Sequence, residues 1–167
     1  MATTGRSDCP INLTAELLGD RWSLVILRDI IFGDRRHFRV LLNESEEGIA
    51  SNILATRLRN LVDEGLLSTS SDATHRQKII YSLTESAIEL LPTMISMGNW
   101  ANKNRSASPI TGPWFAYLYE QGPSVWDELA DDLRHRHLGG PPPRTSAATM
   151  KSLASAYRRR LATTPSE

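Results

Sequence analysis

Two short helices joined by a polar turn are predicted near the middle of the N-terminal half of the chain. Phe38, Leu41 and Leu42 follow the i, i+3, i+4 spacing of one helix face. Residues 36–42 are therefore expected to form the first helix. Polar and acidic residues at 43–48 then interrupt the pattern and predict a turn.

The second helix is predicted over residues 51–64. Ser51 is a favourable N-cap residue, and Gly65 tolerates the left-handed conformation that often follows a helix. A helical wheel places the leucines on one face, namely Leu54, Leu58 and Leu61. The opposite face carries Asn52, Thr56, Arg59, Asn60 and Asp63. A DNA-recognition helix needs this division, but an ordinary amphipathic surface helix shows it too.

A β-hairpin is predicted directly after the second helix. Residues 66–69 favour a strand, residues 70–74 supply turn chemistry, and apolar residues alternate along residues 75–83. The tip and the returning arm carry His75, Arg76 and Lys78. Two helices followed by a basic hairpin are typical of a winged helix-turn-helix, in which the wing, here residues 68–80, contacts the DNA backbone or minor groove.

The net charge of the whole chain does not indicate a nucleic-acid partner. It has 19 basic and 19 acidic residues, so the formal net charge is zero. DNA binding therefore depends on the local placement of cations and polar groups, and each phosphate neutralised adds about 0.9 to the salt slope. One subunit contacts few phosphates, and formation of a homodimer would double that number. The candidate DNA-binding residues are Ser51, Asn52, Thr56, Arg57, Arg59, Asn60, His75, Arg76 and Lys78.

The flanking segments are predicted to be helical. A short helix ends near Gly19, and a longer one begins after Asp20 as its cap. Another helix is expected over residues 84–102, with Pro92 bending or restarting it. Large apolar residues in these helices are more often core or interface than a cofactor site. The candidate ligand or dimer contacts here are Trp22, Ile26, Met94, Met97 and Trp100.

The C-terminal third is expected to be a helical extension behind a linker at residues 106–113. Helices are predicted over residues 124–138 and 149–161. An aromatic cluster lies between the linker and the first of these helices. The extension could cover an apolar groove of a dimer, add dimer contacts, or line a small-molecule pocket with Trp114, Phe115, Tyr117 and Trp126.

Several short motifs lie within about residues 8–102: Cys9-Pro10, GDRWSLVILR at 19–28, GIAS at 48–51, EGLL at 64–67, YSLTE at 81–85 and Trp100-Ala101. In this order and spacing they resemble the motifs of the HxlR-type winged helix-turn-helix regulators of bacteria. The chain departs from the family pattern in the wing, where Gln77 and Lys78 stand in place of a common proline, and at Ser86, where a glycine is frequent. The resemblance implies a transcriptional regulator that binds double-stranded DNA as a two-fold dimer.

The chain has a single cysteine, so an intramolecular disulfide is excluded. Cys9 directly precedes the expected start of the first helix, a position that lowers the pKa of a thiol. In some members of the resembling family, the cysteine at this position senses oxidants or electrophiles. Cys9 is therefore a candidate redox sensor, and a small-molecule or electrophile effector is a candidate partner. A partly buried cysteine that only packs is the alternative.

The sequence predicts a mainly α protein with a small β-hairpin wing (α+β), divided into a DNA-binding and dimerisation domain at 1–104 and an extension at 105–167. The polar start and the charges that interrupt the longest apolar run favour a cytoplasmic protein without membrane contact. No catalytic set accompanies His135 and His137, so we expect no enzyme, metal or cofactor. The alternative function is protein interaction or small-molecule sensing through the extension.

Overall fold

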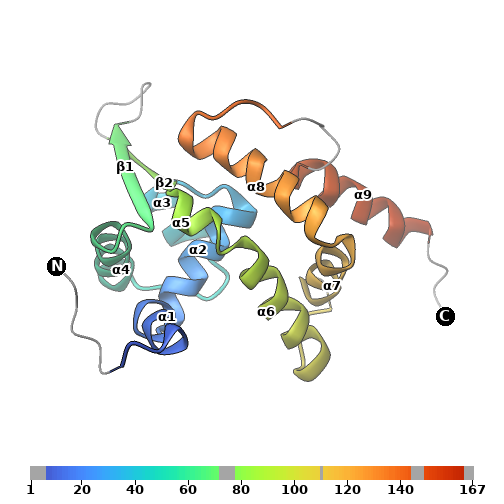
Figure 1. The fold of residues 1–167 in the computed structure, drawn as a ribbon, viewed down its shortest axis with the longest axis horizontal. Helices are drawn as coiled ribbons and strands as arrows, with labels where there is room; N and C mark the ends of the chain where they lie inside the picture. The colour runs from blue at the N-terminus through green and yellow to red at the C-terminus, as the bar shows by residue number, and fades with distance from the viewer. Residues whose placement is uncertain (1–6, 72–77, 110, 144–148, 164–167) are drawn as a thin grey trace. The chain divides into compact units, whose positions relative to one another are not determined.

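The structure is a computed structural model that describes residues 7–71, 78–109, 111–143 and 149–163. It contains two compact units, residues 1–84 and 85–167 (Figure 1). Helices dominate both units, and a two-stranded hairpin belongs to the first. The expected class, mainly α with a β-hairpin wing, is confirmed.

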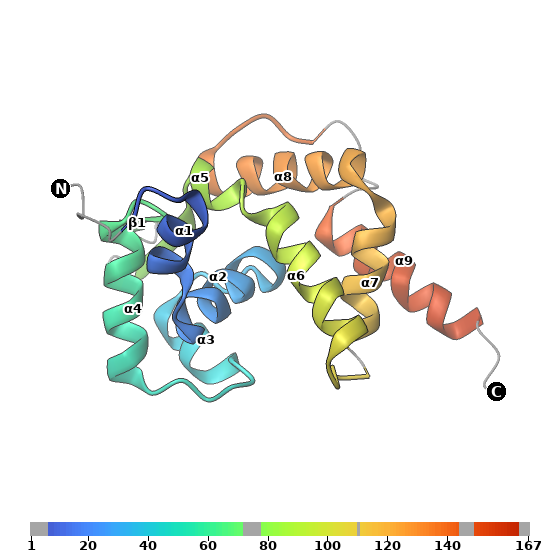
Figure 2. The same ribbon diagram turned by 60° about the horizontal axis from the view of Figure 1, so that its bottom comes forward.

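The N-terminal unit consists of four helices and the hairpin. Its elements are α1 (Pro10–Leu18), α2 (Arg21–Gly33), α3 (Phe38–Glu44), α4 (Ser51–Asp63), β1 (Leu67–Ser71) and β2 (Ile79–Leu83). Helix α4 forms one side of this unit and packs against α2 (Figure 2). The core is aliphatic and fully buried, and includes Ile26, Leu27, Ile30, Leu41, Leu54, Leu58 and Leu83.

Local sequence signals correctly predict the start of α2 and the end of α4. The side chain of Asp20 accepts hydrogen bonds from the backbone N–H groups of Trp22 and Ser23, so the predicted cap of α2 is confirmed. Gly65 adopts a φ of +72°, as expected for the residue that follows the end of α4.

The start of α4 differs from the prediction. Ala50, not Ser51, occupies the N-cap position, and Ser51 is the first helical residue. Ile49 and Leu54 hold the N′ and N4 positions of a hydrophobic staple, and both are buried. The start of the helix therefore has the residue pattern of a hydrophobic staple and no side-chain cap.

Helix α3 begins two residues later than predicted and ends two residues later. The backbone before it is extended because it pairs with β2. The N–H of Tyr81 donates to the carbonyl of Arg36 at 2.8 Å, and His37 forms an isolated antiparallel bridge with Ile80. A short third strand segment thus replaces the first turn of the expected helix.

The hairpin is antiparallel, with Leu67 opposite Leu83 and Ser71 opposite Ile79. The prediction of a turn beginning at Ser70 was wrong, since Ser70 and Ser71 continue β1. Their cross-strand partners are isoleucines, and this pairing outweighs the turn preference of serine. The tip of the predicted wing lies outside the described residues.

The C-terminal unit is entirely helical where it is described. Its helices are α5 (Glu85–Ile88), α6 (Leu91–Asn104), α7 (Thr111–Gln121), α8 (Pro123–Leu138) and α9 (Met150–Thr163). Pro92 lies in the first turn of α6, so the expected restart is confirmed. The linker is shorter than predicted because Thr111–Pro113 begin α7, where the missing N–H of Pro113 costs little.

Close packing joins α6 to α7, and aromatic rings join α7 to α9. A Cβ atom at Gly98 would overlap the ring of Phe115. The ring centroids of Trp114 and Tyr117 each lie 5.3 Å from that of Tyr157. Within the described residues, no helix has the length and apolarity needed to cross a bilayer.

Candidate nucleic-acid interface

Helix α4 has one buried face and one exposed face. Leu54, Leu58 and Leu61 are at most 1% exposed. The polar residues of the opposite face are all exposed: Asn52, Thr56, Arg59, Asn60 and Asp63. The predicted division of this helix into a buried apolar face and an exposed polar face is confirmed.

The side chains of Thr56 and Arg59 on this face differ in their contacts with the rest of the protein. Thr56 Oγ1 donates to the carbonyl of Asn52 at 2.9 Å, which fixes its rotamer and leaves the hydroxyl oxygen available as an acceptor. Arg59 is exposed and forms no ion pair with any residue that the structure describes. Ser51 is exposed in the first turn of the helix.

Arg57 lies on the flank of α4 and is tied to the start of α2. Its Nε is 3.2 Å from Oδ1 of Asp20. Burial raises the pKa of Asp20, but hydrogen bonds from Ser23 and Trp22 and the charge of Arg57 outweigh this effect, so the pKa lies below its ordinary value. Asp20 is therefore ionised at neutral pH and binds α4 to α2.

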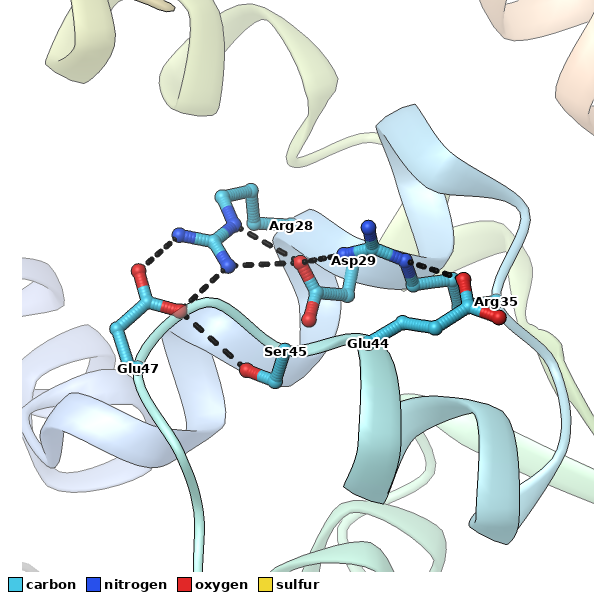
Figure 3. Close-up of polar contacts among 6 residues, drawn as sticks. All are labelled: Arg28, Asp29, Arg35, Glu44, Ser45 and Glu47. Carbon is cyan, nitrogen blue, oxygen red and sulfur yellow. Dashed lines mark hydrogen bonds and ion pairs between the residues drawn. The ribbon is translucent and has the colours of Figure 1, made fainter. Parts of the chain in front are cut away.

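A cluster of charged side chains fixes the turn that leads into α4 (Figure 3). Arg28 Nη2 donates to Glu47 Oε2 at 2.8 Å and to Asp29 Oδ1 at 2.8 Å. Asp29 is only 3% exposed and also pairs with Arg35 at 3.1 Å, and Arg35 in turn contacts Glu44. The hydrogen bonds from Arg28 lower the pKa of Glu47 to about 2.

This cluster was not foreseen from the sequence, which suggested only an acidic turn at 43–48. The available signal was the pair Arg28-Asp29 inside an otherwise apolar helix, because buried charges need partners. The partner Glu47 is 19 residues away, so no local pattern identifies it. The result is a turn that is bonded at both of its ends to α2 and its C-terminal continuation.

The base of the wing is also held in place. Thr84 Oγ1 donates to the carbonyl of Gly65 at 2.7 Å, which joins the end of β2 to the end of α4. Arg36 donates to the carbonyl of Tyr81 and to the hydroxyl of Ser82. Lys78 is exposed just before β2. Two further candidates, His75 and Arg76, lie outside the described residues.

The candidate ligand or dimer contacts divide into core and surface residues. Ile26 and Met94 are buried, whereas Met97 and Trp100 are 46% and 55% exposed on α6. These two exposed residues, with Pro92 and Ala101, line an open apolar groove of about 680 Å³.

The remaining aromatic candidates contact other side chains of the protein. The Arg21 guanidinium lies over the Trp22 ring at 4.6 Å. Trp114, Phe115 and Tyr117 pack within the C-terminal unit.

Cys9 is exposed at the N-cap of α1. The backbone N–H groups of Asn12 and Ile11 lower the pKa of its thiol. Among the described residues, no group of three or more His, Cys, Asp or Glu side chains could hold a metal ion.

The hairpin, the pair α3–α4 and the exposed polar face of α4 define a winged helix-turn-helix protein. The HxlR-like helix-turn-helix family model matches residues 17–109. The chain belongs to this family. Similar proteins are described as HTH-type transcriptional regulators.

Two relatives illustrate the similarity. An uncharacterized HTH-type transcriptional regulator of Synechocystis sp. is 32% identical over 89 residues, which are 53% of this chain and 64% of the relative. One of Mycobacterium bovis is 34% identical over 88 residues, which are 53% of this chain and 54% of the relative. The matched segment thus spans less than two thirds of either relative.

A solved structure supports the fold. The crystal structure of PA1607 superposes with a TM-score of 0.56 at 30% sequence identity, and the match covers 63% of this chain and 70% of PA1607. Both figures are consistent with a shared winged-helix architecture.

Proposed function

We propose that this protein is a sequence-specific DNA-binding transcriptional regulator that places α4 in the major groove. The observation that carries the proposal is the exposed polar face of α4 opposite its buried leucines. A recognition helix must offer donors and acceptors to base edges while its other face stays packed on the domain. The ion pairs at Asp20 and Glu47 supply the rigidity that base reading requires.

Different residues of α4 take different tasks in this proposal. Asn52, Thr56 and Asn60 face the base edges, with Asn suited to bidentate contact with adenine. Arg59 reaches guanine or a flanking phosphate. Ser51, in the first turn, contacts the backbone. Arg57 acts mainly as a positioning residue because Asp20 already holds its guanidinium.

The wing over residues 68–80 supplies the second contact, on the backbone or in the minor groove. Lys78 is exposed at the base of its returning strand. His75 and Arg76 extend the same basic run in the sequence. Because Thr84 and Arg36 fix the base of the hairpin, the wing and α4 are presented to one duplex together.

We further propose that the protein acts as a homodimer. The exposed Met97 and Trp100 on α6 form an apolar surface that water covers poorly. A chain with zero net charge gains affinity for DNA by doubling its phosphate contacts. A two-fold dimer would place two copies of α4 on half-sites one helical turn apart or a multiple of that.

The extension serves packing in this proposal rather than ligand binding. Trp114 and Tyr117 lie against Tyr157, and Trp126 Nε1 donates to the carbonyl of Leu118 at 2.7 Å. The alternative function, small-molecule sensing through the extension, would need these aromatic side chains to contact a ligand. They contact other residues of the extension instead. The division into domains at residue 104 stays a prediction.

The test is binding to a duplex that spans the region upstream of the protein's own gene, measured by fluorescence anisotropy at two salt concentrations. We expect salt-dependent binding that exceeds binding to a scrambled duplex. Asn52→Ala should weaken binding and relax the preference at one base pair, whereas Arg158→Ala, an exposed change on α9, should leave it unchanged. Equal affinity for both duplexes at both salt concentrations would contradict the proposal.

A further inference from the structure

A groove of about 640 Å³ lies between the beginning of α3 and strand β2 in the N-terminal unit. Its volume falls in the range of sites that hold small organic molecules. Phe38 and Val40 line it from α3, and Ile79 and Tyr81 line it from β2. None of these residues belongs to the polar face of α4.

The floor of the groove is apolar and partly open to water. Ile79, the first residue of β2, is 52% exposed. Phe38, Val40 and Tyr81 are half-buried beside it. Contiguous apolar surface of this kind gains free energy when a ligand covers it.

The rim of the groove is basic. Arg39 and Lys78 both line it and are exposed, and neither forms an ion pair with a residue in the described ranges. Arg28 and Arg35, by contrast, form ion pairs with Asp29, Glu44 and Glu47. No acidic residue is among the described residues that line the groove. The site therefore pairs an apolar floor with unneutralised positive charge.

The two walls are bonded to each other. His37 Nδ1 lies 3.2 Å from the carbonyl oxygen of Ile79, and the N–H of Tyr81 donates to the carbonyl of Arg36 at 2.8 Å. The groove is thus preformed, and a ligand need not order its walls.

From this pairing we propose that the groove binds a planar aromatic carboxylate. The ring covers Phe38, Val40 and Ile79, and the carboxylate accepts hydrogen bonds from Arg39 and Lys78. A DNA phosphate would satisfy the two cations but would leave the apolar floor in water. The arrangement of charge around an apolar floor favours the aromatic anion over the nucleic-acid backbone.

Such a ligand would also affect the regulator, a consequence that rests on the proposed function. The groove joins α3, the first helix of the helix-turn-helix, to the returning strand of the wing. A carboxylate bound there neutralises Lys78, which the proposed function assigns to a contact with DNA, so it should weaken DNA binding.

The test uses 1-naphthoate as the probe and isothermal titration calorimetry on the full chain without DNA. We expect saturable binding at one site per chain. The double variant Arg39→Ala/Lys78→Ala should bind at least about tenfold more weakly, the loss expected for charge-assisted hydrogen bonds. Arg59→Ala removes a cation of the same exposed kind outside the groove and should bind like the wild type. The neutral 1-naphthamide should bind more weakly than 1-naphthoate.

Three results would overturn the inference: no binding of 1-naphthoate to the wild type, equal affinity of the wild type and the double variant, or equal affinity for the acid and the amide. If the double variant loses affinity for a duplex while 1-naphthoate does not bind, the groove is a backbone contact instead. Because the calorimetry contains no DNA, its failure is distinguishable from failure of the proposed function. Both substitutions are on the surface, so unfolding curves of the double variant should match those of the wild type.

Discussion

Arg57 Nε lies 3.2 Å from Oδ1 of Asp20, the same oxygen that accepts hydrogen bonds from the N–H groups of Trp22 and Ser23. One carboxylate therefore caps α2 and holds the middle of α4. Two residues further along α4, Arg59 is exposed and makes no ion pair within the described part of the chain. Two arginines of one helix thus differ: Asp20 binds the side chain of Arg57, whereas that of Arg59 is exposed.

Substituting the two arginines should separate stability from DNA affinity. Arg57→Ala should lower the free energy of unfolding by about 1 kcal/mol, because the ion pair is only partly shielded from solvent. Arg59→Ala should leave stability within about 0.5 kcal/mol of the wild type. It should reduce the slope of log K against log salt by about 0.9, the share of one phosphate. Urea unfolding and anisotropy titrations measure the two quantities, and a slope lowered equally by Arg57→Ala would contradict the assignment.

The cluster around Arg28 predicts sensitivity to acid. The pKa of Glu47 is about 2 in the folded protein against an ordinary value of 4.5. A folded-state pKa below the unfolded value stabilises the protein above pH 4.5, and this contribution is lost as the pH falls from 4.5 toward 2. Glu47→Gln should therefore flatten the decline of stability in this interval and lower stability at neutral pH by about 1 kcal/mol.

The adjacent Glu46 provides a matched control for that measurement. It is exposed, so Glu46→Gln should leave the acid unfolding curve close to that of the wild type. If both variants behave alike, the contact between Arg28 and Glu47 does not hold the turn before α4.

Most of the fold follows from local signals in the sequence. The cap of α2 at Asp20 and the left-handed Gly65 after α4 were predictable, because helix capping and left-handed backbone depend on only a few neighbouring residues. Pro92 restarts a helix for the same local reason. The two faces of α4 were predictable because helical periodicity alone separates the leucines from the polar residues.

Two further differences from the sequence prediction arise where distant segments decide the outcome. Ser70 and Ser71 have turn preferences, but pairing with Ile80 and Ile79 keeps them in a strand. The ion pair between Arg57 and Asp20 joins residues 37 positions apart, so the sequence could not distinguish Arg57 from Arg59. A long-range ion pair, not local propensity, distinguishes Arg57 from Arg59.

The packing of α6 on α7 predicts a steric effect at Gly98. Alanine normally stabilises a helix by about 1 kcal/mol relative to glycine. Here the added Cβ would overlap the ring and the Cβ atom of Phe115, and overpacking costs about 1–3 kcal/mol. Gly98→Ala should therefore destabilise the protein in urea unfolding. At Gly140 a Cβ would be 3.5 Å or more from its neighbours, so Gly140→Ala should not show this steric loss.

The position of Cys9 predicts a reactive thiol. The N–H groups of Asn12 and Ile11 lower its pKa, so more thiolate is present at neutral pH than in an unstructured peptide. Alkylation of the folded protein by iodoacetamide at pH 7 should be faster than alkylation of the same protein in urea. If Cys9 senses oxidants, diamide should also yield a dimer on non-reducing gels that Cys9→Ser abolishes. Equal alkylation rates in the two states would rule out activation by the helix.

The exposed apolar side chains of α6 predict the oligomeric state. Met97 and Trp100 together present a surface that a second subunit would remove from water. The wild type should sediment as a dimer in analytical ultracentrifugation, and Met97→Asp/Trp100→Asp should sediment as a monomer because buried unpaired carboxylates oppose association. Leu161 on α9 is 54% exposed, so Leu161→Asp tests whether any lost apolar side chain has this effect. We expect that variant to remain a dimer. A monomeric wild type, or a double variant that still dimerises, would mean that α6 does not form the subunit interface, and the half-site spacing proposed for DNA would lose its structural basis.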